Sequence, residues 1–100
     1  MSNTIPYEER VEVYRQAIDT YGVDAQVLMA IEEMSELTKE LCKVFRSGGT
    51  TNDKIADEVA DVTIMLEQLR IIFELNDAVC EHMDAKIARL KERLEGRNGG

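Results

Sequence analysis

A single proline, at position 6 of 100 residues, is the feature that most restricts what this chain can fold into. Proline is tolerated in the first turn of a helix and disrupts helices elsewhere, so the rest of the chain is open to helix formation. Apolar side chains recur at steps of three and four residues along it, which is the period of an amphipathic α-helix. With aromatic residues at only 5%, the sequence predicts an all-α protein and argues against most all-β folds.

Glycine and short polar turns divide the chain into four predicted helices. Gly22 ends the first helix, and the loop from Ser47 to Asn52 stops the second with two glycines and offers caps for the third. Asn76 and Asp77 supply the last turn. The predicted helices cover residues 6–21, 24–46, 53–75 and 77–94, with Thr4 as the candidate N-cap of the first.

The length of the chain predicts one helical domain over residues 1–95, followed by a flexible glycine-rich tail over residues 96–100. Four helices with short connections favour a four-helix bundle. Apolar residues of the second predicted helix cover an arc of roughly 200°, more than a helix with one exposed face needs. We therefore expect this helix to be packed from two sides, in a bundle that oligomerisation completes.

The charge balance excludes several kinds of partner. Twenty acidic and twelve basic residues give a formal net charge of −8, which repels a nucleic-acid polymer. The sequence has no apolar run of the roughly 20 residues that a spanning helix needs, and its N-terminus does not resemble a signal peptide. We expect a cytoplasmic protein without membrane contacts. The spacing of Cys42 and Cys80 fits neither a disulfide framework nor a zinc site, and their place among apolar helical residues predicts that both are buried free thiols.

Acidic residues gather on two neighbouring helices. Glu33, Glu36 and Glu40 lie within roughly 60° of one another on the second predicted helix, although like charges at these spacings repel. On the third predicted helix, whose expected core stripe is Ile55, Val59, Val62, Leu66, Leu69 and Phe73, Glu58 projects into the stripe and Asp61 lies at its edge. A carboxylate turned toward a core is costly unless it is neutralised, paired or bound to a cation.

The short loop between these helices predicts that they are antiparallel neighbours. The pair Glu33 and Glu36 would then face the pair Glu58 and Asp61. Four facing carboxylates are destabilising by themselves, but an all-oxygen ligand set suits Mg²⁺ or Mn²⁺. The alternative is that Glu33 and Glu36 are ordinary solvated residues of a helix surface, so spacing alone leaves both interpretations open.

The two acidic pairs carry a resemblance to a known family. Glu32-Glu33-x-x-Glu36, followed after one loop by Glu58-x-x-Asp61, resembles the EExxE…ExxD signature of the MazG-like all-α nucleoside triphosphate pyrophosphohydrolases. That superfamily also contains dimeric dUTPases and phosphoribosyl-ATP pyrophosphohydrolase. The resemblance covers roughly residues 27–75, together with the helical layout of the rest.

The resemblance implies a function and a set of roles. Family members cleave the α–β phosphoanhydride of a nucleotide to a monophosphate and pyrophosphate, and usually assemble as dimers or tetramers. For this chain we expect a homodimer or homotetramer that clears non-standard or excess nucleotides. Carried over to this chain, the ligands of Mg²⁺, with Mn²⁺ as a substitute, are Glu33, Glu36, Glu58 and Asp61. Glu32 would either support the metal ligands without binding the ion itself or act as the base that activates the attacking water.

Basic side chains would have to hold the remaining phosphates of such a substrate. Lys54, Lys86 and Arg89 are the candidates, and a solvated helix charge is an equally good interpretation of each. The chain has no Trp and lacks the Asn- and Arg-rich C-terminal segment of some family members, which leaves base selectivity open. Two alternatives remain: a pyrophosphohydrolase for another nucleotide, such as phosphoribosyl-ATP, and a non-enzymatic helical dimerisation or regulatory module.

Overall fold

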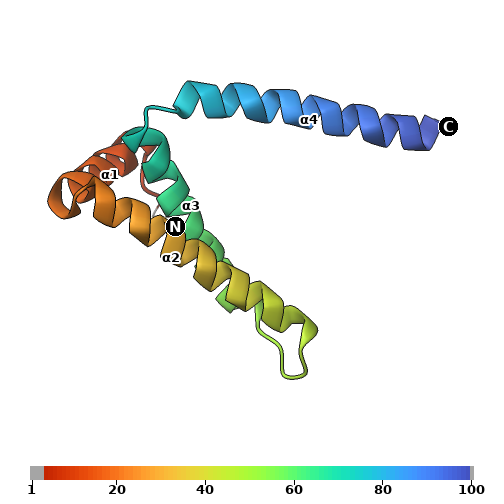
Figure 1. Cartoon of the computed structure of the whole chain (residues 1–100), viewed down its shortest axis with the longest axis horizontal. Coiled ribbons are helices and arrows are strands. Elements are labelled where there is room, and N and C mark those ends of the chain that lie inside the picture. The colour runs from red at the N-terminus through yellow and green to blue at the C-terminus, as the bar shows by residue number, and fades with distance from the viewer. Residues whose placement is uncertain (1–3, 100) are drawn as a thin grey trace.

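The computed structural model describes residues 4–99, with side chains as far as residue 97. It contains four α-helices and one short 3₁₀ helix (Figure 1). These are α1 (Tyr7–Tyr21), α2 (Val23–Cys42), η1 (Lys43–Phe45), α3 (Asn52–Ile72) and α4 (Asn76–Gly99). No strand occurs within residues 4–99, so the prediction of an all-helical protein is confirmed.

The ends of the helices follow from local chemistry at a few residues. Pro6, and not the predicted Thr4, occupies the N-cap position of α1, because helical geometry begins at Tyr7 directly after the proline. Gly22 alone separates α1 from α2, with a φ of 92° that glycine adopts readily. The Thr51 side chain caps α3 by accepting a hydrogen bond from the backbone N–H of Lys54 at 3.2 Å.

Helices α2 and α3 form an antiparallel hairpin that positions the candidate site (Figure 1). Contacts at its two ends fix its register. The side chains of Gln26 and Gln68 are hydrogen-bonded at 2.7 Å near the start of α2, and Thr50 donates a hydrogen bond to Glu40 near its end. Helix α1 lies beside the Gln26 end of the hairpin and contacts both of its helices.

Helix α4 leaves the end of α3 and extends away from the other helices (Figure 1). Among the described helices it contacts α3 alone. The radius of gyration is 17.3 Å, against about 13 Å for a compact domain of this length. A four-helix bundle is therefore not closed within one chain. Helix α4 also continues to Gly99, beyond the predicted end at residue 94 and into the predicted tail, of which residue 100 lies outside the described part.

The core of the described chain is small. Its buried apolar side chains are Tyr14, Ala30, Val62 and Met65. The predicted core stripe of the third helix is wrong at three positions, because Val59, Leu66 and Phe73 are 44–53% exposed. The face of α3 that meets α2 is rotated toward Glu58, Met65 and Gln68, so polar residues take part of the expected apolar contact.

Two further expectations concern the thiols and the membrane. Cys42 and Cys80 are free, as expected, but both are exposed, so their predicted burial is wrong. The helices that carry them are not covered on those faces within one chain. Within residues 4–99, none of the helices has the length and apolar character required to span a bilayer.

Candidate metal centre

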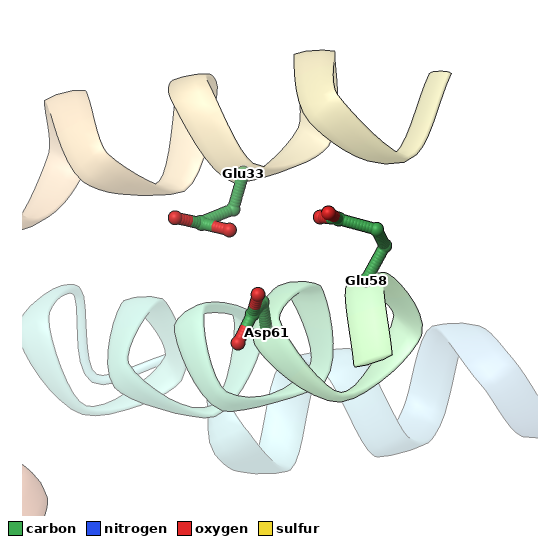
Figure 2. A group of neighbouring side chains, drawn as sticks. All are labelled: Glu33, Glu58 and Asp61. Atoms are coloured by element: carbon green, nitrogen blue, oxygen red, sulfur yellow. The ribbon is translucent and has the colours of Figure 1, made fainter. Parts of the chain in front are cut away.

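Three carboxylates from two helices meet inside the α2–α3 hairpin. Glu33 points from α2 toward α3, while Glu58 and Asp61 point from α3 toward α2 (Figure 2). One carboxylate oxygen of each lies within 4.8 Å of an oxygen of the other two. All three residues are half-buried. We call Glu33, Glu58 and Asp61 the carboxylate cluster.

Helical spacing explains why these three residues come together. Glu33 belongs to the row of α2 that faces α3, seven residues after the buried Gln26 and seven before the buried Glu40. Glu58 and Asp61 are three residues apart on α3 and therefore project from the same side of that helix. The antiparallel register places the two rows opposite each other, which confirms the predicted neighbourhood of the two helices.

Desolvation and the neighbouring acids shift the pKa values of two cluster residues. The pKa of Glu33 is raised, mainly by desolvation and then by the negative charges of Asp61 and Glu58. The pKa of Glu58 is also raised, first by desolvation and next by the charge of Asp61. Both pKa values are shifted in the direction that favours the protonated acids, and a bound cation would oppose that shift.

The other two acids of the signature lie outside this cluster. Glu36 is exposed and forms an ion pair with Lys39, at 3.6 Å between Nζ and Oε1. Its charge nevertheless contributes to the raised pKa values of Glu33 and Glu58, so it is close to the site without being grouped with it. Glu32 is exposed on α2, one residue before Glu33. The structure thus brings together three of the four predicted ligands.

Glu40 is a residue near the site for which we predicted no role from the sequence. It is 7% exposed, accepts a hydrogen bond from Thr50 and pairs with Lys43 at 3.2 Å. The hydrogen bond from Thr50, followed by that from Lys43, lowers the pKa of Glu40. Glu40 therefore ties the α2–α3 loop to the hairpin as a satisfied carboxylate. Its place seven residues after Glu33 puts it on the same row of α2, and this spacing is the signal that could have indicated an inward-facing residue.

The three basic candidates differ in where they lie. Lys54 is exposed at the start of α3, and its charge helps to lower the pKa of Glu40 at the same end of the hairpin. Lys86 and Arg89 are exposed on α4, which extends away from the hairpin (Figure 1). The structure does not bring either of them to the carboxylate cluster of its own chain. No basic side chain of residues 4–97 pairs with a cluster residue in an ion pair.

A buried amide pair adjoins the cluster on the other side. Gln26 and Gln68 are 6% and 4% exposed, and Gln26 donates to Gln68 at 2.7 Å. Gln68 in turn donates to the sulfur of Met65 at 3.7 Å. Sequence reasoning missed this pair, although both glutamines stand seven residues from a cluster acid along their helices. The interior of the hairpin is thus polar along much of its length.

A pocket of about 400 Å³ lies away from this chemistry, between α1, the end of α3 and the start of α4. Tyr14, Arg15 and Arg70 are among its lining residues, and no cluster residue is. Tyr14 donates a hydrogen bond to Glu67, and burial followed by this bond raises its pKa to about 12. Because Arg10 also pairs with Glu67 at 3.7 Å, these contacts hold α1 against α3.

The donor chemistry of the cluster fits a hard divalent cation. Its ligand atoms are carboxylate oxygens from side chains that already converge, without a histidine or cysteine among them. Such a set suits Mg²⁺ or Mn²⁺ better than zinc or copper, which favour nitrogen and sulfur donors. Three carboxylates leave room in a six-coordinate shell for water and for substrate oxygens.

No protein-family model, curated protein or solved structure matches this chain. The arrangement of the carboxylate cluster is therefore the observation on which a functional proposal rests.

Proposed function

We propose that this chain is a Mg²⁺-dependent nucleotide pyrophosphohydrolase that cleaves the α–β phosphoanhydride of a (deoxy)nucleoside triphosphate to a monophosphate and pyrophosphate. The observation that supports it best is the convergence of Glu33, Glu58 and Asp61 from two antiparallel helices. These are three residues of the signature that resembles the MazG-like family. The proposed setting is nucleotide-pool house-cleaning in the cytoplasm by a homo-oligomeric form of the helical bundle.

The roles of the chain's own residues follow from their positions. Glu33, Glu58 and Asp61 would hold the cation, and Glu36, one turn after Glu33, would complete the set by turning inward from its surface ion pair with Lys39. When bound, Mg²⁺ supplies positive charge that polarises phosphoryl oxygens and acidifies a bound water. Glu32 stands beside the cluster on the exposed side of α2, where a carboxylate can accept a proton from water.

Binding of a triphosphate also requires cationic side chains. Lys54 lies on the same helix as Glu58, one turn before it, and is the basic candidate that a single chain keeps near the cluster. Lys86 and Arg89 can serve only if α4 of another copy approaches the site, because their own helix extends away. Phosphate binding by Lys86 and Arg89 therefore depends on the proposed assembly.

A second candidate function is a non-enzymatic dimerisation or regulatory module. The exposed apolar side chains of α2, α3 and α4 favour it, because they provide contact surfaces without any need for catalysis. In that case the carboxylate cluster would be a structural ion site. Another nucleotide with a pyrophosphate group, such as phosphoribosyl-ATP, is the alternative substrate within the enzyme class.

The test is pyrophosphate release from a panel of canonical and modified (d)NTPs, measured with Mg²⁺ and with EDTA. We expect release that requires Mg²⁺ and is lost in Glu58→Gln, which keeps the size of the side chain and removes its charge. Glu92→Gln, on an exposed position of α4, is the matched control and should retain activity. Phosphoribosyl-ATP is included in the panel to separate the two enzyme alternatives.

Either result is informative because folding is monitored in parallel. Wild-type protein that is helical and binds Mg²⁺ but releases no pyrophosphate from any nucleotide would contradict the enzymatic proposal and favour the module. Activity in Glu58→Gln equal to that of the wild type would also contradict it, since the cluster would then not take part in turnover.

A further inference from the structure

The pocket between α1, the end of α3 and the start of α4 has the size of a small-molecule site. Its volume of about 400 Å³ falls within the range of about 300–1,000 Å³ found for ligand pockets. Each of its two long walls is one side of a helix, because the lining residues recur at steps of three and four. They are Tyr7, Val11 and Tyr14 on α1, with Arg15 beside them, and Glu67, Arg70, Ile71 and Glu74 on α3 and the turn after it, with Asn76 and Asp77 from α4.

The pocket contains two guanidinium groups without a carboxylate partner. Arg15 is exposed on α1, and within residues 4–97 its side chain forms neither an ion pair nor a hydrogen bond. Arg70 is half-buried and donates to two uncharged acceptors, the side-chain oxygen of Asn76 at 3.3 Å and the sulfur of Met83 at 3.6 Å. Since arginine keeps its charge at neutral pH, both groups are available to an anion.

Glu67 lines the same pocket but does not neutralise these two arginines. Its Oε2 accepts a hydrogen bond from the Tyr14 hydroxyl, and its Oε1 pairs with Arg10 at 3.7 Å. Burial, followed by this hydrogen bond, raises the pKa of Tyr14 to about 12, so the hydroxyl stays protonated and donates at neutral pH. The charge of Glu67 is therefore compensated within the α1–α3 contact, and an anionic ligand group can bind Arg15 and Arg70.

The rest of the lining offers a flat aromatic surface and hydrogen-bond acceptors. Tyr7 is 67% exposed, and the apolar side chains of Val11 and Ile71 are half-buried. Glu74 and Asp77 are exposed acids that form no ion pair with the side chains of residues 4–97. A complementary ligand thus combines an anionic group, a flat ring and an N–H donor.

We infer that this pocket is a second nucleotide site, which binds a nucleoside monophosphate whose base carries an amino group. Arg15 and Arg70 bind the phosphate, and the base lies against the ring of Tyr7. The amino group donates to Glu74 or Asp77. A monophosphate is a product of the proposed hydrolysis, so the source of the ligand rests on the proposed function. The site itself is separate from the metal centre, because no cluster residue lines the pocket.

Charge favours a monophosphate over a triphosphate in this pocket. A phosphate monoester carries a charge of about −1.5 to −2 at pH 7, which two guanidinium groups can match. A triphosphate would bring more negative charge beside Glu74 and Asp77. The carboxylate cluster that could bind Mg²⁺ and offset this charge belongs to another part of the α2–α3 hairpin.

The pocket lies at the joint between α3 and α4. Glu74, with a φ of 53°, turns the chain at this joint, and Asn76 begins α4 and accepts from Arg70. Among the described helices, α4 contacts α3 alone. A monophosphate bound by Arg15 of α1 and Asp77 of α4 adds a connection between these two helices, so its binding stabilises the folded arrangement of the joint.

The test is calorimetric titration of the metal-free protein in EDTA with cytidine monophosphate and uridine monophosphate. We expect saturable binding of cytidine monophosphate, about tenfold tighter than that of uridine monophosphate, because uracil lacks the amino donor of cytosine. Inorganic phosphate and cytidine, which each supply one part of the ligand, should both bind more weakly than the monophosphate.

Two variants remove parts of the pocket without disturbing the fold. Arg15 has no partner to lose, and Tyr7 is largely exposed. Arg15→Gln and Tyr7→Ala should each weaken the affinity for cytidine monophosphate about tenfold and retain the helicity seen by circular dichroism. Arg93→Gln, at an exposed arginine of α4 without an ion pair among the described side chains, is the matched control and should bind as the wild type.

Several results would overturn the inference. They are the absence of saturable binding, equal affinities for the two monophosphates, and unchanged affinity in Arg15→Gln. Tighter binding of phenylalanine would assign the pocket to an amino acid, and loss of binding in Glu58→Gln would place the monophosphate at the carboxylate cluster. Because the titration contains neither metal nor turnover, failure of this site and failure of the proposed hydrolysis are observed separately.

Discussion

Glu58 projects from α3 into a position where its neighbours along the inward row, Val62 and Met65, are buried apolar residues. Its carboxylate faces Glu33 and Asp61 and has no basic partner among the ion pairs of residues 4–97. Desolvation and the neighbouring charges raise its pKa. A charged group kept in such surroundings reduces the stability of the metal-free protein, and the proposed cation would relieve this cost.

We therefore predict that Glu58→Gln raises the melting temperature of the metal-free protein at neutral pH. A raised pKa means that the folded state gains stability from protonation as pH falls, so the wild type approaches the variant in acid. The difference should be largest above the raised pKa of Glu58 and vanish below its ordinary value. Thermal unfolding followed by circular dichroism in EDTA measures it, with Glu32→Gln as the control on an exposed acid of α2. A lower melting temperature for Glu58→Gln at neutral pH would contradict this account.

Glu40 should show the opposite pH dependence. Its lowered pKa, caused first by the hydrogen bond from Thr50, means that the charged form stabilises the folded state. This contribution is present above the ordinary pKa of Glu and is lost as pH falls through the lowered value. Glu40→Gln should accordingly melt at a lower temperature than the wild type at neutral pH, and the two should converge in acid. Glu95→Gln, in an exposed ion pair on α4, is expected to change little.

The sequence could identify the cluster but not every neighbour. Glu58 and Asp61 were recognisable because they interrupt an apolar stripe, and Glu33 because the short loop predicts facing helices. Spacing alone could not show that Glu33 faces α3 and Glu36 does not. The two side chains differ in direction by only about 60° around α2, yet Glu33 points toward α3 while Glu36 pairs with Lys39 on the surface. The burial of Glu40 depends on Thr50, whose approach is set by the conformation of the loop.

At the scale of elements, the amide pair fixes how α2 and α3 are aligned. A buried Gln that loses its partner leaves polar atoms unsatisfied, which costs about 1–3 kcal/mol. We predict that Gln68→Leu lowers the free energy of unfolding by about this amount, whereas the double variant Gln26→Leu/Gln68→Leu recovers much of the loss, because both amides are removed together. Urea unfolding of the two single variants and the double variant measures the coupling. Additive losses would contradict a direct interaction.

The four helices could be predicted from the sequence, because glycines and capping residues stand at their ends. The end of the second helix differs in one respect. Its apolar period continues to residue 46, whereas α2 ends at Cys42 and the last turn is the 3₁₀ helix Lys43–Phe45. The inward face of α3 could not be predicted in detail. Its apolar residues lie on two sides of the helix, and the packing of Gln68 and Glu58 against α2 leaves Val59 and Leu66 exposed.

At the scale of the whole molecule, the direction of α4 is the property that the sequence did not indicate. Short loops favour a closed bundle, but Glu74, with a φ of 53° after α3, turns the chain so that α4 leaves the other helices. The amphipathic row of α4 is compatible with packing in its own chain or against another copy. Periodicity describes which side of a helix is apolar and not which molecule covers it.

The charge of the whole molecule gives a further prediction. With a net charge of −8, the folded state is weakened by self-repulsion. Added NaCl shortens the screening length from about 30 Å at 0.01 M to about 8 Å at 0.15 M. We expect the melting temperature of the metal-free protein to rise over this range. A fall would show that attractive surface pairs outweigh the repulsion between acids.

The central claim is that Glu33, Glu58 and Asp61 form a site for a divalent cation, and direct titration with Mn²⁺ tests it most simply. Electron paramagnetic resonance measures free Mn²⁺ as the protein is added, without any assumption about a substrate. The account predicts saturable Mn²⁺ binding in which Mg²⁺ displaces the bound Mn²⁺. Glu33→Gln and Glu58→Gln should each weaken the Mn²⁺ affinity at least tenfold, corresponding to about 1.4 kcal/mol. Glu92→Gln should leave the affinity unchanged. Binding that is absent from the folded wild type, or equal in wild type and Glu58→Gln, would contradict it.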